Sequence, residues 1–201
     1  MCGIAGYFGK KSLNRADVEK CLDLMGRRGP DFSGHFHTVT PNGNYVNLLH
    51  SRLSVLDLDE RANQPFGNER FKLVFNGEIY NYQQLKSRPS LNDWQPIGTG
   101  DTEVLFALLT RQWSACLPFL EGMWGLAVYD CSKGVLLLSR DRFGEKPLYI
   151  YTEKNGDVYF GSEPKFIFAL RGQRLSINMD QVRRYLVNGY KSLYKGKDTF
   201  F

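Results

Sequence analysis

Short apolar runs separated by turn residues occupy the first third of the chain. Residues 2–8 are mostly apolar and are interrupted by glycine, which predicts a buried strand. After Asn14, a typical N-cap residue, apolar positions recur every three or four residues and predict a helix that ends near Gly26. Residues 33–39 and 45–51 flank a Pro-Asn-Gly-Asn sequence and predict a β-hairpin.

The rest of the chain continues with strands, hairpins and amphipathic helices. An apolar strand is expected at 71–76, followed by a helix that begins at Asn81 and is limited by Pro89. Asp101 is expected to cap the next helix, whose apolar face repeats at helical spacing. The remaining predicted elements are hairpins at 123–129 with 135–139 and at 148–152 with 158–161, and helices at 163–170 and 179–188.

The order of these elements indicates the fold class. Hairpins dominate and do not alternate with helices, so the pattern favours an α+β class with mostly antiparallel sheets. A length of 201 residues fits one domain with a sizeable core. No linker divides residues 1–190, which we expect to form that domain. Residues 191–201 are expected to begin a connection to a further domain absent from this chain.

Composition and charge exclude several classes of protein. The chain is 42% hydrophobic, too apolar for a disordered protein, yet no apolar run approaches the roughly 20 residues that span a bilayer. Its net charge of +5 comes from interspersed residues of both signs, so no nucleic-acid partner is expected. The first residues lack the features of a secretory signal. We therefore expect a cytoplasmic protein with no membrane partner.

The chain has four cysteines, at Cys2, Cys21, Cys116 and Cys131, without the spacing of a zinc site, so no metal is expected. The last three are expected to be packing residues. Removal of the initiator methionine would leave Cys2 with a free α-amine. An α-amine has a reference pKa of about 7.7–8.0 and a thiol one of about 8.5, so the amine can activate the thiol of the same residue. A cysteine at position two does not by itself establish a nucleophile.

Several motifs follow one another along the chain. It begins Met-Cys-Gly-Ile, and the most specific later motif runs from Asn76 to Asn81, NGEIYN. The others are RRGPD at 27–31, HSRLSVLD at 50–57, QP at 64–65, DTEV at 101–104, GMW at 122–124, RDRFGEKPLY at 140–149 and SE at 162–163. With these motifs the chain resembles the class II glutamine amidotransferases, and among them the glutamine-hydrolysing asparagine synthetase family.

The resemblance implies a fold and a site. The fold is a four-layer αββα arrangement of the N-terminal-nucleophile hydrolase type. Cys2 is the nucleophile that attacks the glutamine amide, and Asn76 and Gly77 donate hydrogen bonds to the resulting oxyanion. Guanidinium suits the substrate carboxylate, and carboxylates suit its α-ammonium group. The substrate-binding roles fall on Arg52, Val55, Asn76, Gly77, Glu78 and Asp101.

The residues themselves leave simpler interpretations open. Arg52 also fits an arginine on a strand surface, Asp101 a helix N-cap, and Asn76-Gly77 a turn at the end of a strand. One segment departs from the family pattern: residues 98–100 read Gly-Thr-Gly where the family usually has Thr-x-Ser. This change removes a hydroxyl beside the α-amino site, and we expect the two glycines to loosen the loop.

The acceptor of the ammonia lies beyond these residues. No phosphate loop of the Ser-Gly-Gly-x-Asp-Ser kind occurs, so this domain is expected to need no cofactor. The resemblance implies that ATP and magnesium act in a C-terminal synthetase domain of the same polypeptide, which converts aspartate to asparagine. Two alternatives stay open: another acceptor, such as a cell-surface sugar, or a non-catalytic regulatory domain. The sequence does not determine the oligomeric state, and a homodimer is left open.

Overall fold

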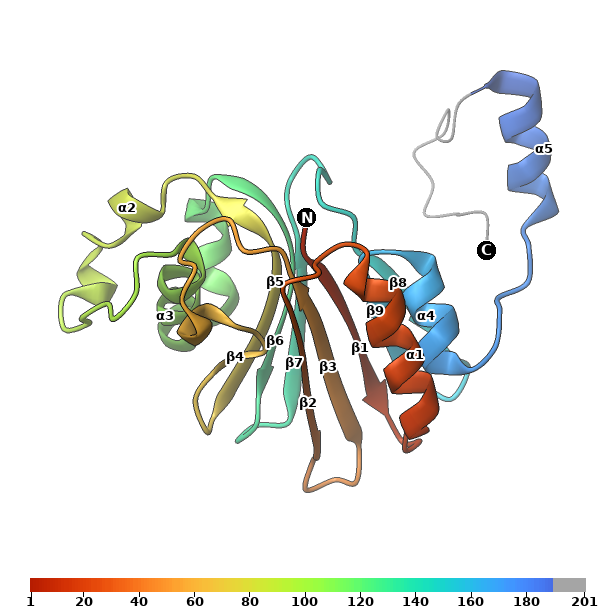
Figure 1. Cartoon of the computed structure of the whole chain (residues 1–201), viewed down its shortest axis with the longest axis horizontal. Coiled ribbons are helices and arrows are strands. Elements are labelled where there is room, and N and C mark those ends of the chain that lie inside the picture. Colours follow the sequence, from red (N-terminus) through yellow and green to blue (C-terminus); the bar gives the residue numbers. More distant parts are fainter. Residues whose placement is uncertain (190–201) are drawn as a thin grey trace.

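The computed structural model describes residues 1–189, an α+β structure whose strand pairings are all antiparallel within that range (Figure 1). The strands are β1 (Gly3–Gly9), β2 (Phe32–Val39), β3 (Tyr45–Arg52), β4 (Phe66–Gly67), β5 (Phe71–Ile79), β6 (Gly122–Asp130), β7 (Val135–Arg140), β8 (Tyr149–Thr152) and β9 (Val158–Gly161). The helices are α1 (Arg15–Gly26), α2 (Tyr82–Leu85), α3 (Asp101–Gln112), α4 (Pro164–Arg171) and α5 (Met179–Asn188). The expected α+β class with antiparallel sheets is confirmed.

The first sheet has the strand order β2-β3-β1-β9-β8 and carries α1 and α4 on one face (Figure 1). Cys21 and Met25 of α1 pack against Phe166 of α4 in a buried cluster. These residues occupy the positions at which the apolar pattern repeats, as an amphipathic helix requires. The side chain of Asn14 accepts a hydrogen bond from the N–H of Ala16 at 3.0 Å, so the predicted N-cap is confirmed.

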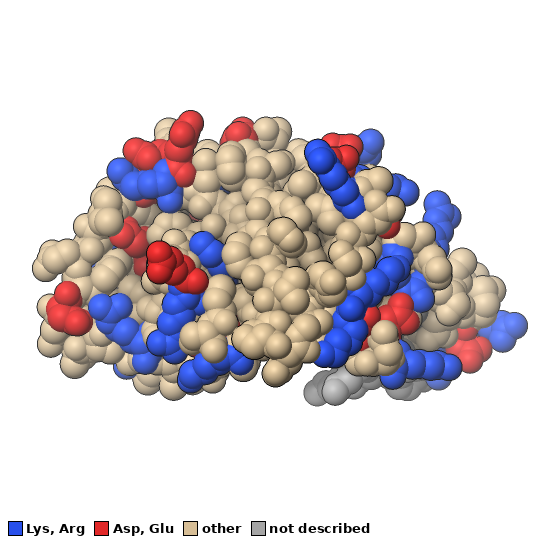
Figure 2. All heavy atoms as spheres, turned by 90° about the horizontal axis from the view of Figure 1, so that it is seen from below, with Lys and Arg blue, Asp and Glu red and all other residues tan. Residues whose placement is uncertain are grey.

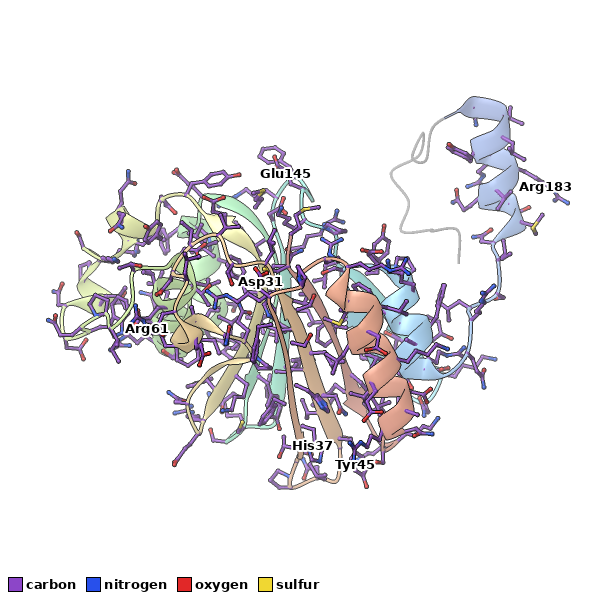
Figure 3. The ribbon with its side chains drawn as sticks, in the orientation of Figure 1. Asp31, His37, Tyr45, Arg61, Glu145 and Arg183 are labelled. Carbon is purple, nitrogen blue, oxygen red and sulfur yellow. The ribbon has the colours of Figure 1, made fainter. Side chains whose placement is uncertain are left out.

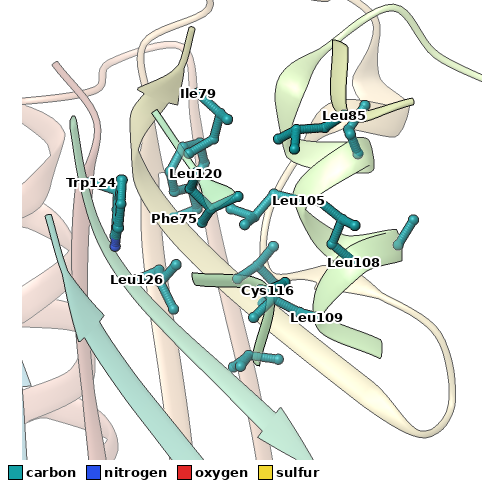
Figure 4. Close-up of a cluster of buried hydrophobic side chains, with 14 of the residues drawn as sticks. Phe75, Ile79, Leu85, Leu105, Leu108, Leu109, Cys116, Leu120, Trp124 and Leu126 are labelled. Atoms are coloured by element: carbon teal, nitrogen blue, oxygen red, sulfur yellow. The ribbon is translucent and has the colours of Figure 1, made fainter. Parts of the chain in front are cut away.

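The second sheet has the order β4-β5-β6-β7 and is covered by α3. Figure 4 shows Leu105, Leu108 and Leu109 of α3 meeting Phe75 of β5 and Trp124 of β6 in the largest of the buried clusters among the described residues. The apolar face predicted for the helix that starts at position 101 is therefore the face that is buried.

A third buried cluster joins the two sheets. Ile4 and Leu48 of the first sheet contact the side of the second sheet that carries Val74 and Ala127, and all four are fully buried. β1 is the central strand of the first sheet, while β5 and β6 are central in the second. This packing brings the beginning of β1 close to the end of β5, which decides where the site lies.

β5 is longer than the sequence analysis predicted. It continues to Ile79, and Asn76 and Gly77 pair with Gly125 and Trp124 of β6 instead of forming a turn. The Asn-Gly pair favours a turn only where the chain is free to reverse. Here β6 offers backbone partners along the whole strand, and this long-range pairing overrides the local preference.

Three further elements correct or extend the predictions. The N-cap of α3 is Gly100, which has no side-chain cap, and Asp101 is the first helical residue. Its carboxylate instead accepts the N–H of Ile79 at 2.8 Å. The helix after Asn81 is only one turn long, Tyr82–Leu85. β4 was not predicted because two residues are too few to produce an alternating pattern.

The described chain ends in α5, which Figure 1 shows apart from the two sheets. The predicted connection at 191–201 lies outside the described residues. Within residues 1–189, no helix combines the length and the apolar character that a membrane crossing requires. On the face seen in Figure 2, basic and acidic side chains are interspersed, as the sequence indicated.

Candidate active site

A cavity of about 430 Å³ brings together every residue to which the resemblance assigns a role. It lies where the chain enters β1, beside the ends of β3 and β5 and the start of α3. The register explains the arrangement, because Gly3 of β1 pairs with Ser51 of β3 and so places Cys2 next to Arg52. The predicted residues that line the cavity are Cys2, Arg52, Val55, Asn76, Gly77, Glu78 and Asp101.

Cys2 is held by contacts of its thiol and of its backbone carbonyl. Its Sγ lies 3.4 Å from the N of Leu53 and 3.6 Å from the O of the same residue. Its carbonyl accepts a hydrogen bond of 2.9 Å from Nε of Arg28, which is paired in turn with Glu163 at 2.9 Å. Gly3 is required beside it, since a Cβ there would lie 2.7 Å from a hydroxyl of β3. The thiol is therefore half-buried and held at the cavity wall.

The loop at 27–31 has a positioning contact with this region. The N–H of Asp31 donates to the carbonyl of Arg52 at 3.0 Å, and its carboxylate accepts the N–H of Ser54 at 2.7 Å. The loop thus holds the backbone on both sides of Leu53, the residue that contacts the thiol. In Figure 3, Asp31 lies away from the hairpin end that carries His37 and Tyr45.

Arg52 is buried and surrounded by the loop that follows β3. Its Nη1 donates to the carbonyl of Asp59 at 3.0 Å and to Oδ1 of Asn63 at 2.8 Å. Its Nη2 donates to the carbonyls of Leu56, at 3.3 Å, and Asp57. Arg52 is therefore not a surface residue. A two-pronged contact with a substrate carboxylate requires one of these carbonyl contacts to be exchanged.

Asn76 contributes an amide donor to the cavity, and Gly77 contributes backbone that packs closely against β6. Asn76 is 1% exposed, and its Nδ2 has no hydrogen-bond partner among the described residues. A buried amide without a partner is unfavourable and is rare in native proteins. Gly77 admits no side chain, because a Cβ would lie 2.2 Å from the carbonyl oxygen of Met123. The site therefore holds an amide donor that lacks an acceptor.

Two buried side chains hold the peptide groups of Phe75, immediately before Asn76. Oε1 of Gln64 accepts the N–H of Phe75 at 2.6 Å, and Nε2 of His50 lies 3.2 Å from its carbonyl oxygen. Complete burial and the nearby Arg52 charge lower the pKa of His50 to about 3, although the hydrogen bond to Phe75 acts in the opposite direction, so the ring is neutral. Sequence reasoning gave these two residues no role, although both lie in quoted motifs.

Asp101 links the start of α3 to the end of β5. The carboxylate is 5% exposed, and its contact with the N–H of Ile79 uses Oδ2. Burial raises the pKa of Asp101, an effect that the hydrogen bond from Ile79 partly offsets. A cation placed against this carboxylate would stabilise its charged form. Glu78, one residue before Ile79, is exposed at the same end of β5.

The loop at 98–100 is tied down, contrary to the expectation that its glycines would loosen it. The carboxylate of Glu103 accepts the N–H groups of Ile97 and Gly98 at 2.8 and 2.7 Å, and Asp57 accepts the N–H of Thr99 at 3.1 Å. A Cβ on Gly98 would lie only 2.5 Å from Oδ2 of Asp57. The glycine thus allows the loop to approach two carboxylates that replace the missing hydroxyl as anchors.

The cavity is also lined by two cationic residues that were not predicted, Arg61 and Lys146. Lys146 lies in the motif at 140–149, which the sequence analysis left without a catalytic role, yet its side chain lines the cavity and is 8% exposed. Its Nζ lies 3.3 Å from Sδ of Met1. Only the burial of its loop against the N-terminus reveals it, because nothing local in the sequence separates it from a surface lysine.

The described residues include no group of three His, Cys, Asp or Glu side chains placed to hold a metal ion. All four cysteines are free. The groups that line the cavity are a thiol, amide and backbone donors, and side-chain charges of both signs.

Sequence comparisons identify the class of protein. Residues 1–200 match the profile of the family described as "Glutamine amidotransferase domain", and the chain belongs to this family. It is an enzyme of the amidotransferase class, and the resemblance inferred from its motifs is confirmed.

The similar curated proteins are longer than this chain. A putative asparagine synthetase [glutamine-hydrolyzing] 2 of Methanocaldococcus jannaschii is 36% identical over 97% of this chain and 41% of its own length. Asparagine synthetase B [glutamine-hydrolyzing] of Escherichia coli is 38% identical over 82% and 29%. Amidase chyE of Penicillium rubens is 33% identical over 84% and 26%. The chain thus spans between 26% and 41% of the length of these relatives.

Proposed function

We propose that this domain hydrolyses glutamine to glutamate and ammonia through a thioester on Cys2. The observation that carries the proposal is the common cavity, which is lined by Cys2 and by Asn76, whose Nδ2 has no partner among the described residues. The fold that the proposal requires is the four-layer αββα type of N-terminal-nucleophile hydrolases. The packing of α1 and α4 on one sheet and of α3 on the other supports it.

The reaction begins once Met1 is removed. The α-amine of Cys2 takes the thiol proton, and the thiolate attacks the amide carbon of glutamine. The carbonyl electron pair moves to oxygen, where Nδ2 of Asn76 and the N–H of Gly77 donate hydrogen bonds. The intermediate expels ammonia with the proton held by the α-ammonium and leaves a thioester. Water then attacks, with the amine as base, and glutamate is released.

The rest of the cavity orients the substrate. Arg52 receives the α-carboxylate, the backbone of Val55 borders it, and the carboxylates of Asp101 and Glu78 receive the α-ammonium. Two features support these roles. The buried Asp101 carboxylate has a raised pKa, which a bound cation would offset, and the Arg52 guanidinium is already desolvated and oriented.

Replacing Arg52 by alanine is expected to raise KM for glutamine while changing kcat less. Each hydrogen bond to a charged group contributes about 1.5–3 kcal/mol, so the loss of one such bond raises KM by about tenfold or more. Steady-state glutamate release measures both constants. Arg70→Ala is the matched control, because Arg70 pairs with Asp130 far from the cavity. A variant with unchanged KM contradicts the assignment.

The ammonia is proposed to serve a C-terminal synthetase domain that uses ATP and magnesium to convert aspartate to asparagine. The longer relatives named as glutamine-hydrolysing asparagine synthetases support this division. In the same proposal, residues 1–190 are the glutaminase domain and 191–201 begin the connection. The amidase among the relatives favours a second candidate, in which the same glutaminase supplies a different acceptor.

The present chain is expected to release glutamate from glutamine and to make no asparagine from aspartate and ATP. The proposed hydrolytic residues lie within residues 2–101, and no phosphate loop occurs in the sequence. Both products are assayed side by side on protein whose intact mass lacks one methionine. Asparagine formation contradicts the division of labour. No glutamate from the processed protein favours the regulatory-domain alternative.

A further inference from the structure

Lys146 is held at the cavity by an unusually constrained turn. The carboxylate of Asp141 accepts the N–H groups of Phe143, Glu145 and Lys146 at 3.1, 2.9 and 2.9 Å. Nε of Arg140 donates to the carbonyl of Lys146 at 2.9 Å. Burial alone would raise the pKa of Asp141, but these backbone hydrogen bonds lower it, so the carboxylate that holds the turn stays charged. Both backbone groups of Lys146 are therefore fixed, and with them the place of its side chain.

The ammonium of Lys146 has no carboxylate partner among the described residues. Within the described part of the chain, the polar contact of Nζ is with the thioether of Met1 at 3.3 Å, whereas a buried cation is normally paired with an anion. Met1 is the residue whose removal creates the α-amine of Cys2. Processing therefore removes this contact of Nζ and generates a second amine on the same cavity wall.

We propose that the ammonium of Lys146 favours the neutral form of the Cys2 α-amine, the form that can accept the thiol proton. This inference rests on the proposed function, in which that amine is the base. Two positive charges in one partly buried cavity repel each other, so the group that binds its proton less tightly loses it first. An α-amine binds its proton less tightly than a lysine amine. Lys146 is accordingly a positioning residue that acts through Cys2.

Other charges around the two amines stay the same when Lys146 is replaced. Arg28 on the side of α1 is neutralised by Glu163, and the anionic Asp31 binds the backbone of Ser54. Among the described residues, the remaining charged groups of the cavity and its turn are Arg52, Asp57, Arg61, Glu78, Asp101, Glu103, Arg140, Asp141, Arg142 and Glu145. Replacement of Lys146 by methionine, which has similar length, therefore removes a single positive charge.

The pH profile of glutamate release tests the inference. The neutral amine is the active form, so activity rises with pH through the midpoint of the acid limb. Lys146→Met is expected to move this midpoint upward by about one pH unit, which lowers activity about tenfold on the acid limb and little at high pH. Lys146→Arg retains the charge and is expected to retain the profile. Lys154→Met, at the exposed β8–β9 turn, is the matched control.

A second measurement does not depend on turnover. In a Cys2→Ala background, where the thiol is absent, the rate of N-terminal acetylation by acetic anhydride is followed by mass spectrometry against pH. Lys146→Met is expected to shift this rate profile upward by about one unit. An unmoved or lowered midpoint in both assays overturns the inference, as does an equal loss of turnover at every pH. If acetylation shifts but the processed Cys2 protein releases no glutamate, the proposed function fails and the inference stands.

Discussion

Cys2→Ala is expected to abolish glutamate release and to leave the folded structure in place. The thioester cannot form without the thiol, and the thiol of Cys2 lies at the cavity with long contacts to the N and O of Leu53. The other cysteines are poor substitutes. Burial raises the pKa of the Cys21 thiol well above its usual value. Burial also raises the pKa of Cys116 to about 11, although a hydrogen bond and a nearby arginine act in the opposite direction. The measurement is glutamate release at high enzyme concentration, with thermal unfolding to verify the fold.

Cys131→Ala is the matched control for this variant. Cys131 is half-buried like Cys2 but lies outside the cavity, and burial raises the pKa of its thiol. It should retain most of the activity. A diazo-ketone analogue of glutamine should alkylate Cys2 alone, as peptide mapping will reveal. Labelling of Cys131, or an equal loss of turnover in both variants, would contradict the assignment of the nucleophile.

Asn76→Ala is expected to lower kcat by about 10²–10³ with a much smaller effect on KM, because one oxyanion donor typically contributes that much to turnover. The donor matters most after the negative charge has formed on oxygen. The folded state should lose little stability, since Nδ2 of Asn76 has no partner to lose among the described residues. Steady-state kinetics and thermal unfolding measure the two effects.

Asn81→Ala gives the opposite pattern and serves as the comparison. Both ends of its amide are bonded, Nδ2 to the carbonyl of Phe119 at 2.9 Å and Oδ1 to the N–H of Glu121 at 3.0 Å. Removing a bonded buried amide costs about 1–3 kcal/mol of stability, while kcat should stay near that of the unsubstituted protein. If Asn76→Ala instead raises KM and leaves kcat intact, the oxyanion role is wrong.

The contrast between Asn76 and Asn81 also explains why the site was only partly predictable. Both residues belong to one sequence motif, and nothing in the local pattern distinguishes them. The structure places one amide inside the cavity without an acceptor and uses the other to hold the loop before β6. The difference arises from long-range packing, which local propensity does not contain.

The sequence by itself determined most of the local structure. Period-two and helical patterns, with Asn14 as a cap, predicted the hairpins and helices because these signals depend on residues close in the chain. The family motifs further indicated Cys2 and its companions, and the cavity contains all of them. Errors occurred at Asn76-Gly77 and Asp101, where a local turn or cap preference was overridden by partners in β6 and β5.

Only the tertiary structure decided the environment of each site residue. Burial and the absence or presence of a partner set the energetic state of Asn76, Asp101 and Lys146, and these depend on segments more than twenty residues away. The packing of β1 against β5 brings Cys2 and Asn76 to the same cavity. Desolvation is a property of the assembled fold, so no stretch of sequence encodes the buried ammonium beside the N-terminus.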